Sequence, residues 1–213
     1  PADRISIVPG NHDALVPVVE ARGAGLWETW TRAEDGWPYV HRVGGVSLIG
    51  LNSARPTAPL LAQGELGAAQ LARLEPLLRA EREAGQIRVL LLHHPVAAGA
   101  VSWRKALVDA AELRAVLQRG GAELVLHGHA RDARLDALRG PQGPIPCVCV
   151  PSSSALPNPR DEGARWNRLR VSGSAQAPRV EVEVRRWSVP DQAFVPVAQY
   201  ELCLPRQPVA ARG

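Results

Sequence analysis

The chain has 213 residues, of which 46% are hydrophobic and 22% are charged, so it can bury a sizeable core. This balance excludes a disordered tail, a collagen-like repeat and a small disulfide-stapled domain. The net charge of +4 arises from 25 cations scattered among 21 anions, which disfavours nucleic acid as a partner. Since no apolar run reaches the roughly 20 residues of a membrane-spanning helix, we also expect no membrane association. The chain lacks Met and enters an apolar run at Ile5, so we expect an upstream segment in the intact protein.

Short apolar runs alternate with helical patterns in the first half, which is typical of an α/β sheet. We expect strands at residues 4–8, 46–51, 87–92 and 123–126. A helix is predicted over residues 64–85, and Pro76 should kink or split it because an interior proline costs about 3 kcal/mol. A second helix should begin at Asp109, which forms a capping-box pattern with Glu112, and end at Gly120.

The second half is richer in β-like segments, with strands expected at residues 145–150, 166–171, 179–187 and 197–204. Residues 179–185 alternate strictly between polar and apolar, which predicts a strand with one buried and one solvent-exposed face. We therefore expect a single domain over residues 1–205, with a second, more antiparallel sheet packed on the first, and a tail over 206–213. Cys147 and Cys149 share one face of a strand, and we interpret them as core residues in a reducing compartment, the cytoplasm.

Residues 22–39 stand apart, because they contain Trp27, Trp30 and Trp37 without clean periodicity. This pattern predicts either a long functional loop beside a site or a small aromatic cluster beneath a loop. Trp103 and its neighbours have the same two interpretations, the mouth of a substrate site or an ordinary loop anchor.

Three of the expected strands run directly into a turn that contains histidine. These turns lie at residues 9–13, 92–95 and 126–129. Because ligands bind at the carboxyl ends of strands in open α/β sheets, we expect the three turns to converge on one site. Imidazole nitrogens and an amide oxygen suit a divalent ion such as Zn, Mn or Fe. The sequence therefore predicts a metal site that is open to substrate.

The motifs Gly10-Asn11-His12-Asp13, Leu92-His93-His94-Pro95 and Gly128-His129 occur in this order, and the chain thereby resembles the calcineurin-like metallophosphoesterases. The run from Pro151 to Ala155 is similar to bacterial members related to the class III cyclic-nucleotide phosphodiesterases. The resemblance implies an α/β fold, the four-layer α-β-β-α sandwich of that family, without its N-terminal strand or strands.

The resemblance also implies roles for individual residues. Asn11, His93 and His129 would be ligands to the second of two divalent metal ions. His12 would be catalytic, protonating the leaving group or contacting the phosphate, and Asp13 would support it by fixing the local geometry. His94 would be a supporting residue at the substrate. The implied reaction is attack of a metal-activated hydroxide on the phosphorus of a small phosphodiester or phosphomonoester.

Two features differ from the family pattern. The family's Asp-x-His and Gly-Asp motifs, which hold the first metal, would lie upstream of this sequence, and we expect the chain to be aggregation-prone without that segment. Arg131 stands where the family has its last histidine, and a guanidinium cannot coordinate a cation. Arg131 could disable the first metal position, bind phosphate directly as a substrate-binding residue, or be replaced as a ligand by His127. The alternative to a phosphoesterase is therefore a catalytically degenerate relative that binds a phosphate ligand or a protein partner.

Overall fold

A computed structural model of the chain describes residues 4–14, 30, 36–156 and 163–207. The described helices are the 3₁₀ turns η2 (Asn11–Ala14) and η3 (Trp103–Lys105) and the α-helices α2 (Ala68–Glu83) and α3 (Ala110–Gly120). The strands are β1 (Tyr39–Val43), β2 (Val46–Gly50), β3 (Ile87–Leu91), β4 (Leu124–His127), β5 (Arg134–Gly140), β6 (Gly143–Cys149), β7 (Arg165–Ser174), β8 (Ala177–Ser188) and β9 (Ala193–Leu202).

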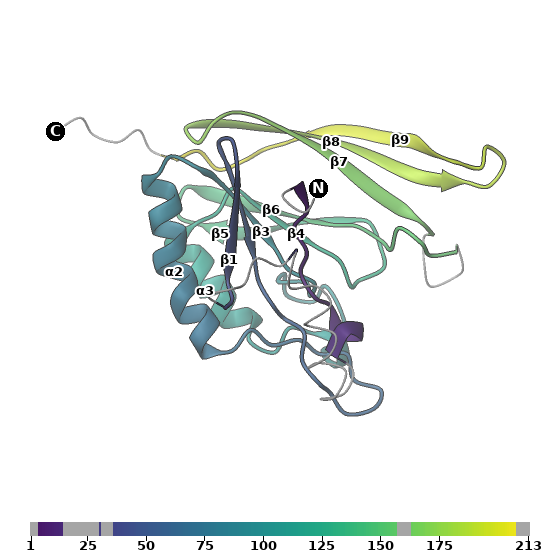
Figure 1. The fold of residues 1–213 in the computed structure, drawn as a ribbon, viewed down its shortest axis with the longest axis horizontal. Helices are drawn as coiled ribbons and strands as arrows, with labels where there is room; N and C mark the ends of the chain where they lie inside the picture. The colour runs from purple at the N-terminus through teal and green to yellow at the C-terminus, as the bar shows by residue number, and fades with distance from the viewer. Residues whose placement is uncertain (1–3, 15–29, 31–35, 157–162, 208–213) are drawn as a thin grey trace.

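Nine strands form two sheets in the described part of the chain. The larger sheet has the order β1-β2-β3-β4-β6-β5, with β2, β3, β4 and β6 parallel and the two edge strands antiparallel to their neighbours. The smaller sheet is the antiparallel β7-β8-β9. Helices α2 and α3 lie side by side on one face of the larger sheet, and the smaller sheet lies across its other face (Figure 1). The parallel strands therefore direct their carboxyl ends, and the turns that follow, to one edge.

Each face of the larger sheet has its own apolar core. Leucines of α2 and α3, among them Leu74, Leu78 and Leu113, pack with Ile49 and Leu90 on the helical side. The second core joins side chains of the two sheets: Ile87, Val89, Leu124 and Val148 from the larger sheet, and Val180, Val182, Val184 and Leu202 from the smaller one. The strict alternation of residues 179–185 is thereby explained, because the apolar positions of β8 face the other sheet.

The fold is the expected α/β type, with a six-stranded mixed sheet and packed helices. Most expected strands and both helices are present within a few residues of their predicted bounds. The layers supplied by residues 36–156 and 163–207 are helix, sheet and sheet, so the described helices cover one outer face only (Figure 1). None of these helices is long and apolar enough to cross a bilayer.

The strand expected at residues 4–8 is wrong. This segment runs without ladder hydrogen bonds to the η2 turn and is held by side chains instead. Ser6 Oγ lies 2.6 Å from His41 Nδ1, and the Tyr39 hydroxyl donates to the Ile7 carbonyl at 3.0 Å. Alternating apolar residues favour a strand only where a neighbouring strand supplies a ladder, and the described part of the chain supplies none here.

The helices differ from expectation at two points. Helix α2 is not split at Pro76: Pro76 and Ala72 both lie on its exposed face, where water can solvate the carbonyl that has lost its donor. Asp109 makes no side-chain cap for α3. Its carboxylate instead accepts from the amides of Leu66 (2.9 Å) and Gly67 (2.8 Å), so it joins the start of α3 to the start of α2.

Two strands were not expected. Strand β1 pairs with β2 across Gly44-Gly45, a two-residue connection of the type that favours hairpins because glycine tolerates a positive φ, here 57° at Gly44. Strand β5 pairs with β6 across Pro141 and Gln142. Of the aromatic segment at residues 22–39, residues 22–29 and 31–35 lie outside the described residues, while the Trp37 ring packs on Tyr39 with centroids 5.3 Å apart.

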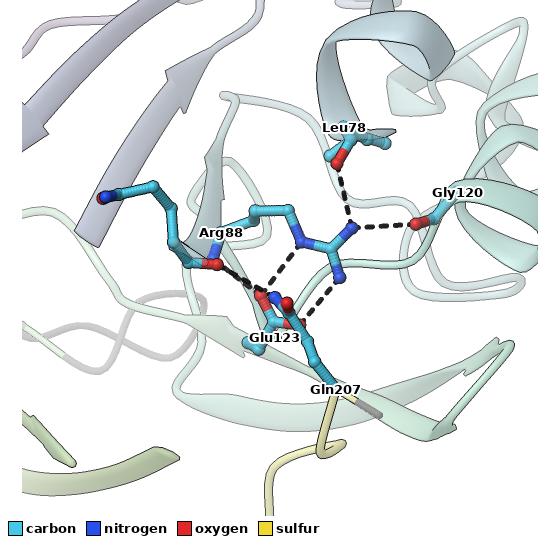
Figure 2. Close-up of polar contacts among 6 residues, drawn as sticks. Leu78, Arg88, Gly120, Glu123 and Gln207 are labelled. Atoms are coloured by element: carbon cyan, nitrogen blue, oxygen red, sulfur yellow. Dashed lines mark hydrogen bonds and ion pairs between the residues drawn. The ribbon is translucent and has the colours of Figure 1, made fainter. Parts of the chain in front are cut away.

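A buried ion pair closes the opposite end of the larger sheet. The Arg88 side chain is 0% exposed and that of Glu123 is 1% exposed, and they are joined at 2.8 and 3.1 Å. Arg88 also donates to the carbonyls of Leu78 and Gly120, where α2 and α3 approach the sheet (Figure 2). Gln207 donates to Glu123 at 3.2 Å, so the folded body extends at least to Gln207, two residues beyond the expected boundary.

Candidate metal centre

The three histidine-bearing turns meet at the carboxyl edge of the larger sheet. Backbone hydrogen bonds continue past the ends of the parallel strands: the Leu92 amide donates to Leu126 at 3.2 Å and the Gly128 amide donates to His93 at 3.1 Å. These bonds hold the turn after β3 against the turn after β4. The convergence expected from strand order is therefore what the structure shows, although the segment before Gly10 is not a strand.

Three polar atoms from the three turns face one another. His93 Nε2 lies 3.0 Å from Asn11 Oδ1 and 3.0 Å from His129 Nδ1. The ligand nitrogens of His93, His94 and His129 all lie within 4.8 Å of one another. Two ligand atoms on one cation, each bonded at about 2.1 Å and at right angles, would stand about 3.0 Å apart. The spacing of the Asn11, His93 and His129 atoms therefore fits a shared divalent cation.

The first turn is closed on itself by Asp13. The Gly10 amide donates to Asp13 Oδ2 at 2.8 Å, and the Asp13 amide donates to the Gly10 carbonyl at 3.0 Å. A β-carbon on Gly10 would stand 2.9 Å from His93 Cε1 and Nδ1, closer than such atoms normally approach. Asp13 thus holds the turn that carries Asn11, and the bare Gly10 backbone leaves room for the His93 ring.

His94 lies behind the cluster and not in the open site. Its side chain is fully buried at 0% exposure, with Nδ1 2.8 Å from Ser53 Oγ and Nε2 3.2 Å from the Ala62 carbonyl. Both ring nitrogens therefore have partners, and the ring packs against His129 with centroids 4.5 Å apart. A β-carbon on Gly64 would meet His94 Nδ1 at 2.3 Å. This environment suits a supporting residue and leaves no free nitrogen for a substrate.

The third turn has an unusual backbone. His129 and Arg131 adopt φ values of 67° and 66°, the left-handed region that non-glycine residues rarely occupy. Such backbone strain often accompanies functional sites. His129 Nε2 is buried and has no hydrogen bond of normal geometry to the described residues. The turn therefore fixes His129 toward His93 at the expense of local backbone energy.

His127 is directed elsewhere. It is buried, and its Nδ1 lies 3.2 Å from the Gly128 carbonyl. It does not line the cavity that contains the other histidines. The alternation of side chains along β4 separates it from His129, and it lies apart from the cluster that His93 and His129 form.

Burial keeps the clustered histidines neutral. It lowers the pKa of His93 to about 4 and that of His129 to about 4, with neighbouring positive groups adding to the effect. It also lowers the pKa of His94 to about 3. Neutral imidazole is the form that coordinates a metal. The donor set of one amide oxygen and two neutral imidazoles thus fits Zn, Mn or Fe in chemical type as well as in spacing.

The cluster opens into a cavity of about 650 Å³, large enough for a small organic phosphate. His12 is exposed at this cavity, as is Arg131. The described residues that line the cavity are Asn11, His12, Ala62, His93, Lys105, Gly128, His129, Arg131, Val150, Pro151, Ser152, Ser153 and Ala155. Lys105 was one of the neighbours of Trp103 for which the mouth of a substrate site and a loop anchor were both open, and Ser152 and Ser153 were not identified as site residues. The sequence signal for Ser152 and Ser153 is their position directly after β6, at the same sheet edge as the histidine-bearing turns.

Comparison with known families agrees with this geometry. The calcineurin-like phosphoesterase family matches the chain over residues 2–130, which include all three histidine-bearing turns. The chain belongs to this family. A search among curated proteins found no match.

Proposed function

We propose that the chain forms the catalytic domain of a metal-dependent phosphoesterase that hydrolyses a small phosphodiester or phosphomonoester. The observation that carries this proposal is the meeting of Asn11, His93 and His129 in the lining of an open cavity, where His93 Nε2 lies 3.0 Å from a ligand atom of each of the other two. These residues come from three separate turns, at distances in sequence of 82 and 36 residues from one another. Membership of the calcineurin-like phosphoesterases supports the same chemistry.

The position of each residue in the cavity indicates its role. Asn11, His93 and His129 would hold the cation, which when bound supplies an ionisable water and neutralises phosphoryl charge. His12, exposed at the cavity, would donate a proton to the leaving alkoxide or bind the phosphate. Asp13 would act through the turn it closes, without contacting the substrate.

Arg131 would bind phosphoryl oxygens directly. A guanidinium matches the oxygens of phosphate with its fork of N–H donors, and Arg131 faces the cavity close to His129. The cation and the guanidinium would then contact the same phosphoryl group from two sides.

Hydrolysis of bis(p-nitrophenyl) phosphate and p-nitrophenyl phosphate, with added Mn, Fe or Zn, tests the proposal. Asn11→Ala and His93→Ala should lower the rate at least 100-fold, because each removes a ligand. Asn167→Ala, an asparagine on β7 outside this cavity, is the matched control and should retain the rate. Equal background rates for the wild-type chain and Asn11→Ala would refute the proposal.

The resemblance to bacterial metallophosphoesterases supports further details of the origin, location, substrate and metal content. We propose a bacterial, cytoplasmic enzyme with a small phosphate-ester substrate and no role for nucleic acid, and cyclic nucleotides are the first substrates to assay. Two divalent ions would be bound in the intact protein, the second of them at Asn11, His93 and His129. Metal content per chain after loading with Mn, measured by mass spectrometry, tests the number.

The second candidate is a degenerate relative that binds a phosphate ligand or a protein partner without turnover. Arg131 favours this candidate, because it stands where the family has a histidine ligand and brings a positive charge toward the metal position. Arg131→His separates the two functions. A large gain in bound metal and in turnover would show a disabled catalytic site, whereas loss of turnover in an active wild type would show that Arg131 serves the phosphoryl group.

A further inference from the structure

The cavity contains the only lysine of the chain. Lys105 is the last residue of the η3 turn and lines the cavity together with His129 and Arg131. Its charge helps to lower the pKa of the His129 ring, as does that of Arg131, so both cations act on the same part of the site. Neither residue is part of the metal-binding cluster.

The backbone around Lys105 is fixed. The Lys105 amide donates to the Ser102 carbonyl at 2.9 Å, which closes the turn. On either side of it, the Arg104 carbonyl accepts from the Ala62 amide at 2.8 Å, and the Ala106 carbonyl accepts from the Gly64 amide at 3.1 Å. The segment at residues 62–64 is the same one that accepts a hydrogen bond from His94 and packs against its ring. Lys105 is therefore held at a set position relative to the histidine cluster.

No described carboxylate neutralises the charge of Lys105. Within residues 4–14, 36–156 and 163–207, no carboxylate lies within ion-pair distance of Lys105 or of Arg131. The described residues that line the cavity likewise include no carboxylate. By contrast, Arg88, Arg119 and Arg134 all have acidic partners. Two unneutralised cations in one cavity favour a ligand that carries several negative charges.

The two cations differ in what they can reach. Arg131 follows His129 by two residues and is placed to contact the phosphoryl group, as proposed above. Lys105 belongs to another segment, η3, and a cavity of about 650 Å³ exceeds the volume of a single phosphate group. A compact ammonium at the end of a flexible stem binds an anion as a point charge without a demand for bidentate geometry.

We propose that Lys105 binds a second acidic group of the substrate, a carboxylate or a phosphate separate from the scissile phosphate ester. This inference rests on the proposed function for the position of the scissile group. It assigns the substrate class as small phosphate esters that carry an additional acid, in preference to esters whose remaining part is neutral.

Binding of two matched probes tests the assignment without turnover. Phosphoglycolate carries a phosphate and a carboxylate, whereas ethyl phosphate carries the phosphate alone. Calorimetric titration of the full chain at low ionic strength, in buffer passed over a chelating resin, gives both dissociation constants. The wild-type chain should bind phosphoglycolate about fivefold more tightly than ethyl phosphate, which is the upper range for one solvent-exposed ion pair.

Three variants assign the preference to Lys105. Lys105→Gln should abolish it while leaving the affinity for ethyl phosphate unchanged, and Lys105→Arg should retain most of it. Arg104→Gln is the matched control, because Arg104 is the neighbouring cation of the same turn, lies over the Trp103 ring at 5.6 Å and does not line the cavity. It should keep the wild-type preference.

The assignment is overturned if wild type shows no preference, if Lys105→Gln keeps it, or if neither probe binds. These outcomes are distinct from failure of the proposed function. A chain that prefers phosphoglycolate through Lys105 but hydrolyses no ester under any metal supports the assignment and refutes catalysis. A chain that hydrolyses esters but shows no preference for phosphoglycolate supports catalysis and refutes the assignment of Lys105.

Discussion

The buried ion pair of Arg88 and Glu123 should be a principal determinant of stability, and Arg88→Met tests this. The Glu123 carboxylate accepts from Arg88 Nε at 3.1 Å, from a terminal guanidinium nitrogen at 2.8 Å, and from the Arg88 backbone amide at 2.6 Å. With Met at position 88 the carboxylate keeps the backbone amide and Gln207 but loses the cation that pairs with it. The carbonyls of Leu78 and Gly120 lose their donor at the same time (Figure 2).

Removal of one partner of a buried ion pair costs about 3–5 kcal/mol, because the other charge stays buried without compensation. A domain of this kind is stable by about 5–15 kcal/mol, so Arg88→Met should remove a large share of the free energy of unfolding. Urea denaturation followed by tryptophan fluorescence and by circular dichroism measures the loss. The double variant Arg88→Met/Glu123→Leu should be more stable than Arg88→Met alone, since no unpaired charge is left.

Arg119→Met is the matched control. Arg119 of α3 pairs with Glu75 of α2 at 2.8 Å, but both groups are open to solvent. Arg119→Met should therefore have little effect on the urea midpoint. A loss below about 1 kcal/mol in Arg88→Met, or equal losses in Arg88→Met and Arg119→Met, would refute the reasoning.

Three further predictions concern the site, acid stability and thiol reactivity. Gly10→Ala should weaken Mn binding in calorimetric titration by about tenfold or more, because its β-carbon would displace the His93 ring, and unchanged affinity would contradict this. The Arg42 guanidinium lowers the pKa of the Glu81 carboxyl below its ordinary value of 4.5. The ionised Glu81 therefore stabilises the fold above pH 4.5, and this stabilisation is lost as the pH falls through the lowered pKa. Glu81→Gln should therefore flatten the decline of Tm in acid, and a parallel decline would count against it. Burial raises the pKa of the two cysteines of β6 to about 12 and about 11, so a disulfide reagent at pH 8 should modify only Cys203 in the folded chain, and a second rapid thiol would be inconsistent.

The local signals of the sequence predicted most of the fold because each reflects a short-range physical requirement. The alternation of residues 179–185 identified β8, and the leucine pattern of residues 64–85 identified α2. The Gly44-Gly45 pair was equally visible, but no strand was predicted for the residues that precede it in β1. The segment at residues 4–8 has the composition of a strand and is not one, because composition does not say whether a neighbouring strand is available to pair with it.

Some residues of the candidate site could be predicted from the sequence and others could not. His93 and His129 follow the parallel strands β3 and β4, so strand order alone could place them together, whereas Asn11 was placed beside them through an expected strand at residues 4–8 that the structure does not contain. Lys105 could not be placed from strand order, since it reaches the cavity on a loop whose path depends on hydrogen bonds to residues 62–64. The roles of Gly10 and Gly64 were also hidden, because the space that each leaves is filled by a ring more than 25 residues away in sequence. Such contacts are properties of packing and carry no local pattern.

The charges of the cavity connect cation binding with anion binding. Asn11, His93 and His129 are neutral ligands, so a divalent ion held by them would keep its full charge beside Arg131 and Lys105. Repulsion from these two cations weakens metal binding when the cavity holds no anion, and a bound phosphate group removes that repulsion. Since coupling between two ligands is reciprocal, the metal must strengthen phosphate binding by the same factor by which phosphate strengthens metal binding. Under the proposed function, Arg131 would therefore shift affinity from the metal alone toward the metal and the phosphate ester together.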